Sequence, residues 1–172
     1  PFFNDTTSYL KLIMQVIIET PKGSAQKYDY DLNDHFFDLK KILPAGMMFP
    51  YDFGFIPGTK GMDGDPLDVI LISEFNSFPG CRINCRLIGA LKAKQTGEDK
   101  NKMIRNDRFI AIPKCSNIFQ NIKTIGDLPE NIIKELEDFF VDYNKIEGKT
   151  FKILGKLSPK EAHKLVDLSQ RN

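Results

Sequence analysis

The sequence predicts a mainly β domain, a small barrel or sheet, with helices packed outside it. Two observations favour this fold class. Short segments rich in Ile and Val fill the first two-thirds of the chain, and the apolar residues take helical spacing in the last third. The 172 residues suit one domain, placed at 1–172, and no repeat, linker or low-complexity tract divides the sequence.

Strands are expected where β-branched and apolar residues run up to a turn signal. The pair Asn33-Asp34 suits a hairpin turn between two of these strands, and Pro113 ends the last one. The continuous apolar run at 67–73 is typical of a strand buried on both faces. The expected strands are 12–20, 27–32, 35–39, 67–73, 82–93 and 108–112.

Two helices are expected near the C-terminus. Asp127, with Glu130 three residues later, resembles a capping box, and apolar residues then recur at helical spacing as far as Gly148. A second capping box, Ser158 with Glu161, begins the other helix. These helices would cover the sheet from outside.

Composition excludes several classes of protein. Lys and Arg number 24 against 23 Asp and Glu, so the net charge of +1 favours neither nucleic acid nor a membrane as partner. The apolar runs are too short to span a bilayer. Cys81, Cys85 and Cys115 are odd in number, which indicates reduced thiols and a cytoplasmic protein. The chain begins at Pro1 without a signal-peptide pattern, and an export signal upstream would lie outside this sequence.

Three carboxylates, Asp63, Asp65 and Asp68, lie within six residues just before a buried strand. Asp63 and Asp65 are alternate residues and can point the same way. Such close anions repel one another, and a cation allows all three to stay ionised. Oxygen ligands without His or Cys nearby favour Mg²⁺, with Mn²⁺ as the other choice. A plain polar turn is the alternative interpretation, because Asp-Gly and Asp-Pro are common turn dipeptides.

Other charged residues lie on the expected strands, where alternation would turn them inward. Each one alone is most often a solvated surface charge. Together they are the mixture that a site for metal and phosphate requires. They are Glu19, Lys27, Asp29, Lys40, Lys41, Arg105, Asp107 and Arg108.

The stretch from Asp63 to Val69, DGDPLDV, resembles the signature of family I soluble inorganic pyrophosphatases. The resemblance covers nearly the whole chain, and further matching blocks lie in family order at 16–21, 27–29, 53–57, 110–113 and 139–143. It implies a five-stranded OB-type β-barrel with two or more helices outside. It also implies Mg²⁺-dependent hydrolysis of pyrophosphate to two phosphates, and a homo-oligomer, commonly a hexamer in bacterial members.

The resemblance also implies roles for individual residues. Asp65 is the catalytic residue that takes a proton from the attacking water. Asp63 and Asp68 bind metal, and Glu19 and Asp29 are outer ligands of metal, water or substrate. The phosphate ligands implied by the match are Lys27, Lys41, Arg108 and Tyr143.

The sequence departs from the family pattern at several of these positions. Lys41 replaces an arginine and so loses the bidentate fork, and Phe49 and Phe53 replace tyrosines. The residue after Tyr143 is Asn144 where the family has lysine, so Lys145 or Lys149 is expected in that role.

The segment 94–108 is longer than the family pattern, which places two further metal-binding aspartates there. We choose Asp107 for one of them, with Asn106 as the competing alignment. Glu98 or Asp99 is expected to supply the other.

Three hypotheses follow for the function. The first is an inorganic diphosphatase. The second is a module on the same barrel that binds single-stranded nucleic acid or another polyanion. The third is a weak or altered phosphohydrolase, in which the departures have changed the substrate.

Overall fold

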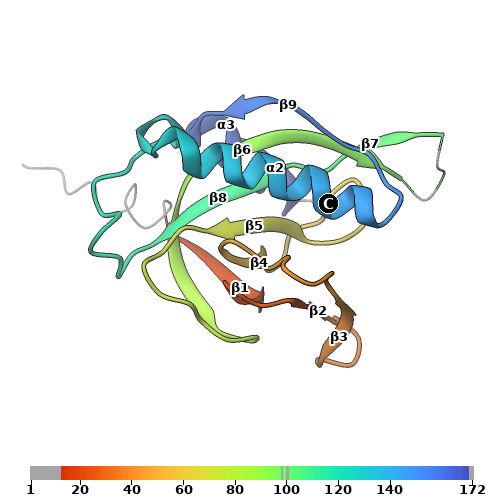
Figure 1. The fold of residues 1–172 in the computed structure, drawn as a ribbon. Coiled ribbons are helices and arrows are strands. Elements are labelled where there is room, and N and C mark those ends of the chain that lie inside the picture. The colour runs from red at the N-terminus through yellow and green to blue at the C-terminus, as the bar shows by residue number, and fades with distance from the viewer. Residues whose placement is uncertain (1–12, 98, 100, 171–172) are drawn as a thin grey trace, which may run out of the picture.

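The computed structural model describes residues 13–97, 99 and 101–170. This part of the chain is mostly β, and five of its strands pair side by side in a closed ring (Figure 1). The mainly β, five-stranded prediction is therefore confirmed. In order around the ring the strands are β1 (Met14–Thr20), β4 (Asp52–Ile56), β5 (Leu67–Leu71), β8 (Arg108–Pro113) and β6 (Arg82–Thr96), which pairs again with β1.

Strand β6 closes the ring because it is long enough to pair along its length with several partners. Its first residues pair with β1, its middle with β8, and its later residues with β9 (Phe151–Leu157) and β7 (Met103–Arg105). The register of the β6–β8 pair shifts next to Gly89, whose φ is +142°. A Cβ there would lie 2.4 Å from the carbonyl oxygen of Leu157, so only glycine lets β9 approach this closely.

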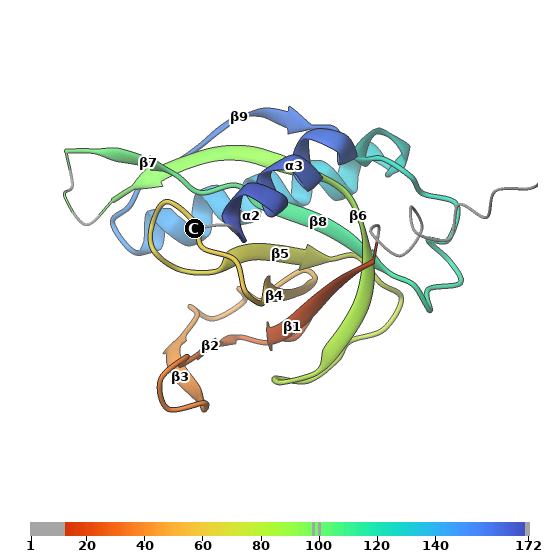
Figure 2. The ribbon, with the colours of Figure 1, turned by 180° about the vertical axis from the view of Figure 1, so that it is seen from behind.

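The hydrophobic core has two parts, one on each face of the strands. One part joins residues of all five ring strands to helix α3 (Pro159–Ser169), and the other joins β4, β5, β6, β8 and β9 to helix α2 (Glu130–Ile146). Val69 and Ile70 are consecutive and belong to different parts, because alternate side chains of a strand point to opposite faces. Figures 1 and 2 show α2 and α3 on opposite sides of the sheet. The expectation that 67–73 is buried on both faces is thus confirmed.

The two helices differ in how well the sequence located their starts. Ser158 and Glu161 form the expected capping box, in which the Glu161 amide donates to Ser158 Oγ at 3.3 Å. Asp127 does not cap α2, so that prediction is wrong. Its carboxylate accepts from the amides of Lys123 and Thr124, and it stabilises the short 3₁₀ turn Ile125–Asp127 instead.

Three strands were missed from the sequence, and the second strand of the expected hairpin begins at Phe37 and not at residue 35. Strands β4, β7 and β9 were not predicted, while β2 (Gln26–Tyr30) and β3 (Phe37–Ile42) form the hairpin that projects from the ring in Figure 1. Leu12, the first residue of the expected strand 12–20, lies outside the described residues. No helix in the described ranges has the length and apolar character needed to cross a membrane.

Candidate active site

A cavity of about 480 Å³ opens between the β2–β3 hairpin, the loop before β5, the start of β8 and the C-terminal end of α2. Eight residues to which the resemblance assigns a definite role line it together. They are Glu19, Lys27, Asp29, Asp63, Asp65, Asp68, Arg108 and Tyr143.

The turn before β5 brings the three aspartates to the same cavity. Gly64 has a φ of +94°, which favours glycine, and the Gly61 amide donates to the Asp65 carbonyl at 2.7 Å. Asp68 follows as the second residue of β5, paired in register with Phe55 of β4. The local turn therefore positions Asp63 and Asp65, and the ring positions Asp68.

Asp68 and Asp63 are joined through a chain of side chains from β8 and the residues before it. The buried Arg108 guanidinium donates through Nη1 to Asp68 Oδ2 and to Asn106 Oδ1. Asn106 Nδ2 then donates to Asp63 Oδ2 at 2.7 Å. The guanidinium carbon lies 5.0 Å from the centroid of the Phe140 ring, so α2 also holds this arginine in place.

A second ion-pair group faces the first from β1 and β2. Lys27, only 7% exposed, pairs with Asp29 and lies 3.5 Å from Glu19 Oε2. The Tyr30 amide donates to the other Glu19 oxygen at 2.9 Å. The Lys27 ammonium lies 5.0 Å from the ring centroid of Phe53, so the ring that replaces a family tyrosine packs beneath a lysine.

Burial disfavours negative charge at several of these carboxylates. It raises the pKa of Glu19 to about 7, against the opposing effect of Lys27. Burial also raises the pKa of Asp65, with a further contribution from Asp63, and it raises the pKa of Asp68 despite the nearby Arg108. Additional positive charge in the cavity would relieve this cost.

Two of the predicted metal ligands lie outside the cavity. Asp107 accepts from Arg105 Nε at 2.9 Å and from the Ala93 amide at 2.9 Å, which turns its carboxylate away. Asp99 is exposed on the turn between β6 and β7 and lies 3.5 Å from the Lys102 ammonium. Glu98, the alternative to Asp99, lies outside the described residues.

Two amides of the same chain segment line the cavity. Asn106 was the competing alignment to Asp107, whereas Gln95 was not predicted, because a single glutamine on a strand carries no signal. Gln95 Oε1 lies 3.5 Å from Arg108 Nη2. Neighbouring residues of an extended segment point to opposite sides, so only one of Asn106 and Asp107 can face the cavity.

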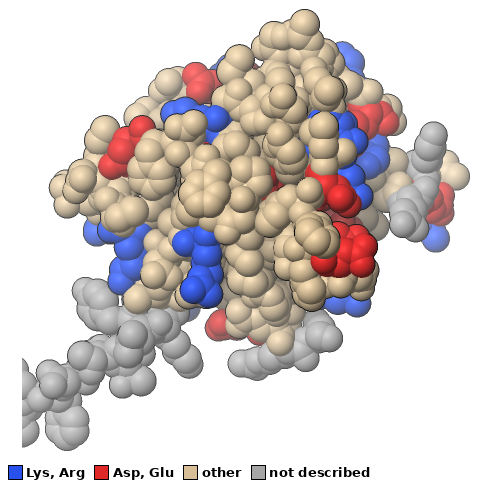
Figure 3. Space-filling model, turned by 90° about the horizontal axis from the view of Figure 1, so that it is seen from below, with Lys and Arg blue, Asp and Glu red and all other residues tan. Residues whose placement is uncertain are grey.

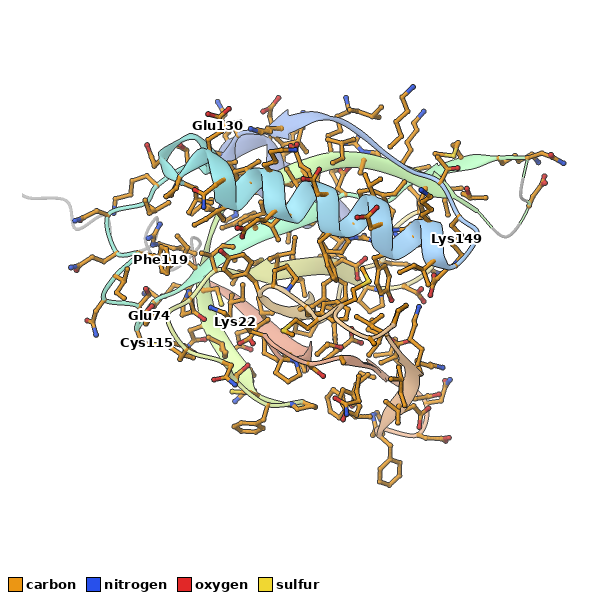
Figure 4. The ribbon with its side chains drawn as sticks, viewed as in Figure 1. Lys22, Glu74, Cys115, Phe119, Glu130 and Lys149 are labelled. Carbon is orange, nitrogen blue, oxygen red and sulfur yellow. The ribbon has the colours of Figure 1, made fainter. Side chains whose placement is uncertain are left out.

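Of the two lysines expected near Tyr143, only one lines the cavity. Lys149 lines the cavity, just past the C-terminal end of α2 in Figure 4, and lies 3.4 Å from Glu147. Lys145 is exposed on α2 and does not line the cavity. Lys41 does not line the cavity. It pairs with Glu147, which does, and its ammonium lies 4.6 Å from the Tyr143 ring centroid.

The donor set of the cavity fits a hard cation. Within the described ranges, no three Asp, Glu, His or Cys side chains are gathered closely enough to hold a metal ion as they stand. The carboxylates of Asp63 and Asp68 have Asn106 and Arg108 as partners instead. Cation binding would exchange these partners for the ion, and carboxylate oxygen is the ligand that Mg²⁺ prefers.

The charge on one face of the molecule is mixed. On the face that Figure 3 shows, acidic and basic side chains lie beside one another in small groups. Among the described residues that line the cavity, eight are Asp or Glu and four are Lys or Arg. This balance differs from the basic groove that tracks a nucleic-acid backbone.

Comparison with known proteins agrees with this geometry. The family model described as inorganic pyrophosphatase matches residues 16–172. The inorganic pyrophosphatase of Sulfolobus acidocaldarius is 38% identical over 161 residues, covering 91% of this chain and 89% of that one. That of Geobacillus stearothermophilus is 36% identical over 155 residues, or 90% of each chain.

Solved structures show the same likeness. The inorganic pyrophosphatase of Thermus thermophilus superposes with a TM-score of 0.85 at 29% identity, covering 99% of this chain and 94% of that one. That of Neisseria gonorrhoeae superposes with a TM-score of 0.85 at 31% identity, covering 94% of this chain and 91% of that one. With a family model that spans nearly all of its length, the chain belongs to the inorganic pyrophosphatase family.

Proposed function

We propose that this chain hydrolyses inorganic pyrophosphate to two phosphates with Mg²⁺ as its cofactor and Mn²⁺ as a substitute. One observation carries the proposal. The three aspartates at the start of β5 share one cavity with cationic side chains from β2, from β8 and from beyond α2. Family membership supports the same reaction.

Asp63 and Asp68 would hold the cation, with Glu19 nearby as an outer ligand. When bound, Mg²⁺ neutralises charge on the substrate and lowers the pKa of a bound water toward ~7. Asp65 would accept the proton of the attacking water, because it shares the turn with Asp63 and faces the same space.

The cationic side chains would hold the two phosphate groups. Lys27 of β2, Arg108 of β8 and Lys149 of the loop after α2 approach the cavity from different parts of the chain, so they can contact different oxygens of the substrate. Preorganised cations stabilise the charge that builds on the leaving phosphate. Tyr143, from α2, lines the same cavity, and its hydroxyl would donate a hydrogen bond to a phosphate oxygen.

Phosphate release from pyrophosphate tests the proposal directly. We expect release with Mg²⁺, none with EDTA, and a loss of about 10²–10³-fold in kcat in Asp65→Asn and Asp68→Asn. Asp138→Asn is the matched control, since Asp138 is exposed on α2 and pairs with Lys134. Full activity in either cavity variant would contradict the assigned roles.

The binding-module hypothesis receives less support. The excess of carboxylates in the cavity would repel a single-stranded nucleic acid in the absence of metal. Titration with a labelled oligonucleotide should show no binding, and tight salt-sensitive binding would revive that hypothesis.

We also propose a homo-oligomer, a hexamer by resemblance, in a reducing compartment such as the cytoplasm. Large apolar side chains exposed on the single chain support association, and they include Phe36 and Ile42 of the hairpin region, each 71% exposed. Cys81, Cys85 and Cys115 are free, which suits reducing conditions. Light scattering of the purified chain would give its mass in solution.

A further inference from the structure

One part of the cavity wall carries two amide side chains, and one of them, Asn106, contacts the aspartate turn. Gln95 of β6 and Asn106, just before β8, line this wall together with Arg108. We propose that Asn106 limits the affinity of this site for a divalent cation, because it places a neutral amide where a carboxylate would add a charged ligand. The inference deepens the proposed function and rests on its cation site.

The contacts of Asn106 show how the amide acts. Its Nδ2 donates to Asp63 Oδ2 at 2.7 Å, and its Oδ1 accepts from Arg108. The amide therefore satisfies Asp63 without a cation. A cation bound at Asp63 Oδ2 competes with this donor, and turning the amide to offer Oδ1 to the cation takes the acceptor away from Arg108. Either change opposes cation binding.

The rest of the wall supplies no negative charge. Gln95 is neutral, and the Arg108 guanidinium repels a divalent ion that approaches Asp63 from this side. The carboxylate nearest in sequence, Asp107, is held outside the cavity by Arg105 and by the Ala93 amide. A bound cation therefore takes its charged ligands from the turn before β5, from β5 itself and from β1 and β2, and receives none from β6 or β8.

A substitution that preserves shape tests this directly. Asn106→Asp adds one charge beside Asp63 with almost no change in volume. Gln95→Glu adds one charge to the same cavity from β6 and serves as the second variant if the first fails to fold. Asn131→Asp is the matched control, because Asn131 is exposed on the first turn of α2. Figure 4 shows Glu130, the neighbour of Asn131, at the end of the helix opposite to Lys149, which lines the cavity.

The probe is Mn²⁺ alone, titrated into each full-length protein at pH 7.5 and followed by calorimetry. We expect the Kd of Asn106→Asp to fall by about tenfold or more, that of Gln95→Glu to fall in the same direction, and that of Asn131→Asp to match the wild type. A Kd within about threefold of wild type in every cavity variant that folds would overturn the inference. An equal gain in Asn131→Asp would overturn it too.

This experiment separates the inference from the proposed function. Pyrophosphate hydrolysis by the wild type at saturating Mg²⁺ tests the function, while the Mn²⁺ titration needs no turnover. A wild type that binds Mn²⁺ without hydrolysing pyrophosphate would refute the function alone. Hydrolysis by the wild type with no gain in Mn²⁺ affinity in Asn106→Asp or Gln95→Glu would refute the inference alone.

Discussion

Replacing Arg108 with methionine would remove the cation that joins Asp68 to Asn106. The substitution keeps an unbranched side chain that can still pack on Phe140 and Phe151, whose ring centroids lie 5.0 and 5.3 Å from the guanidinium carbon. The main loss is therefore the charge and its hydrogen bonds. Arg108 is 5% exposed, so solvent cannot replace it at Asp68 without rearrangement.

The cost follows from leaving Asp68 without its partner. Removing one member of a buried ion pair destabilises a protein by about 3–5 kcal/mol. The Asp68 side chain is 22% exposed, which places the expected loss at the lower end, about 3 kcal/mol in the metal-free protein. Burial already raises the pKa of Asp68, and losing Arg108 raises it further. The unpaired carboxyl destabilises the fold when ionised, so the loss should shrink as the pH falls and Asp68 becomes protonated.

Urea unfolding in EDTA at pH 8 and pH 5 measures both effects. The set is wild type, Arg108→Met, Asp68→Asn and the double variant. We expect the double variant to be more stable than the sum of the two single losses implies, by about 2 kcal/mol, since neither charge is then left alone. Strictly additive losses, or an equal loss for Arg108→Met at both pH values, would refute the reasoning.

Three further predictions concern stability. In metal-free protein, the raised pKa of Glu19, about 7 against 4.5, should make the wild type lose up to about 3 kcal/mol as the pH rises from 4.5 to 8. Glu19→Gln should flatten that dependence in urea unfolding, and an unchanged slope would count against it. Gly54→Ala should abolish folding or lower the free energy of unfolding by more than about 3 kcal/mol, because the new Cβ would lie 2.1 Å from the Ile17 carbonyl oxygen. Circular dichroism on heating measures this, and a variant that unfolds at the wild-type temperature would contradict it. Ser158→Ala should cost about 1 kcal/mol in urea unfolding through loss of the α3 cap, and unchanged stability would contradict that role of the cap.

Secondary structure was predictable from sequence where neighbouring residues decide it. The capping box at Ser158 needs only residues within one helical turn, and it forms as expected. Strand β9 was missed because Lys152, Gly155 and Lys156 interrupt its apolar pattern, and its place depends on pairing with β6. Strand β4 contains Gly54, which weakens a local strand signal but permits the close approach to β1.

The shared direction of Asp63 and Asp65 was likewise predictable from the sequence itself, since one short turn brings both side chains to the same cavity. Tertiary structure alone decided what stands opposite them. Adjacent side chains of an extended segment point to opposite sides. Which of them faces the cavity depends on how the segment pairs with strands that are distant in the sequence. In the folded ring Asn106 therefore faces the cavity and Asp107 faces away from it, and Lys149 lines the cavity because it follows the end of α2.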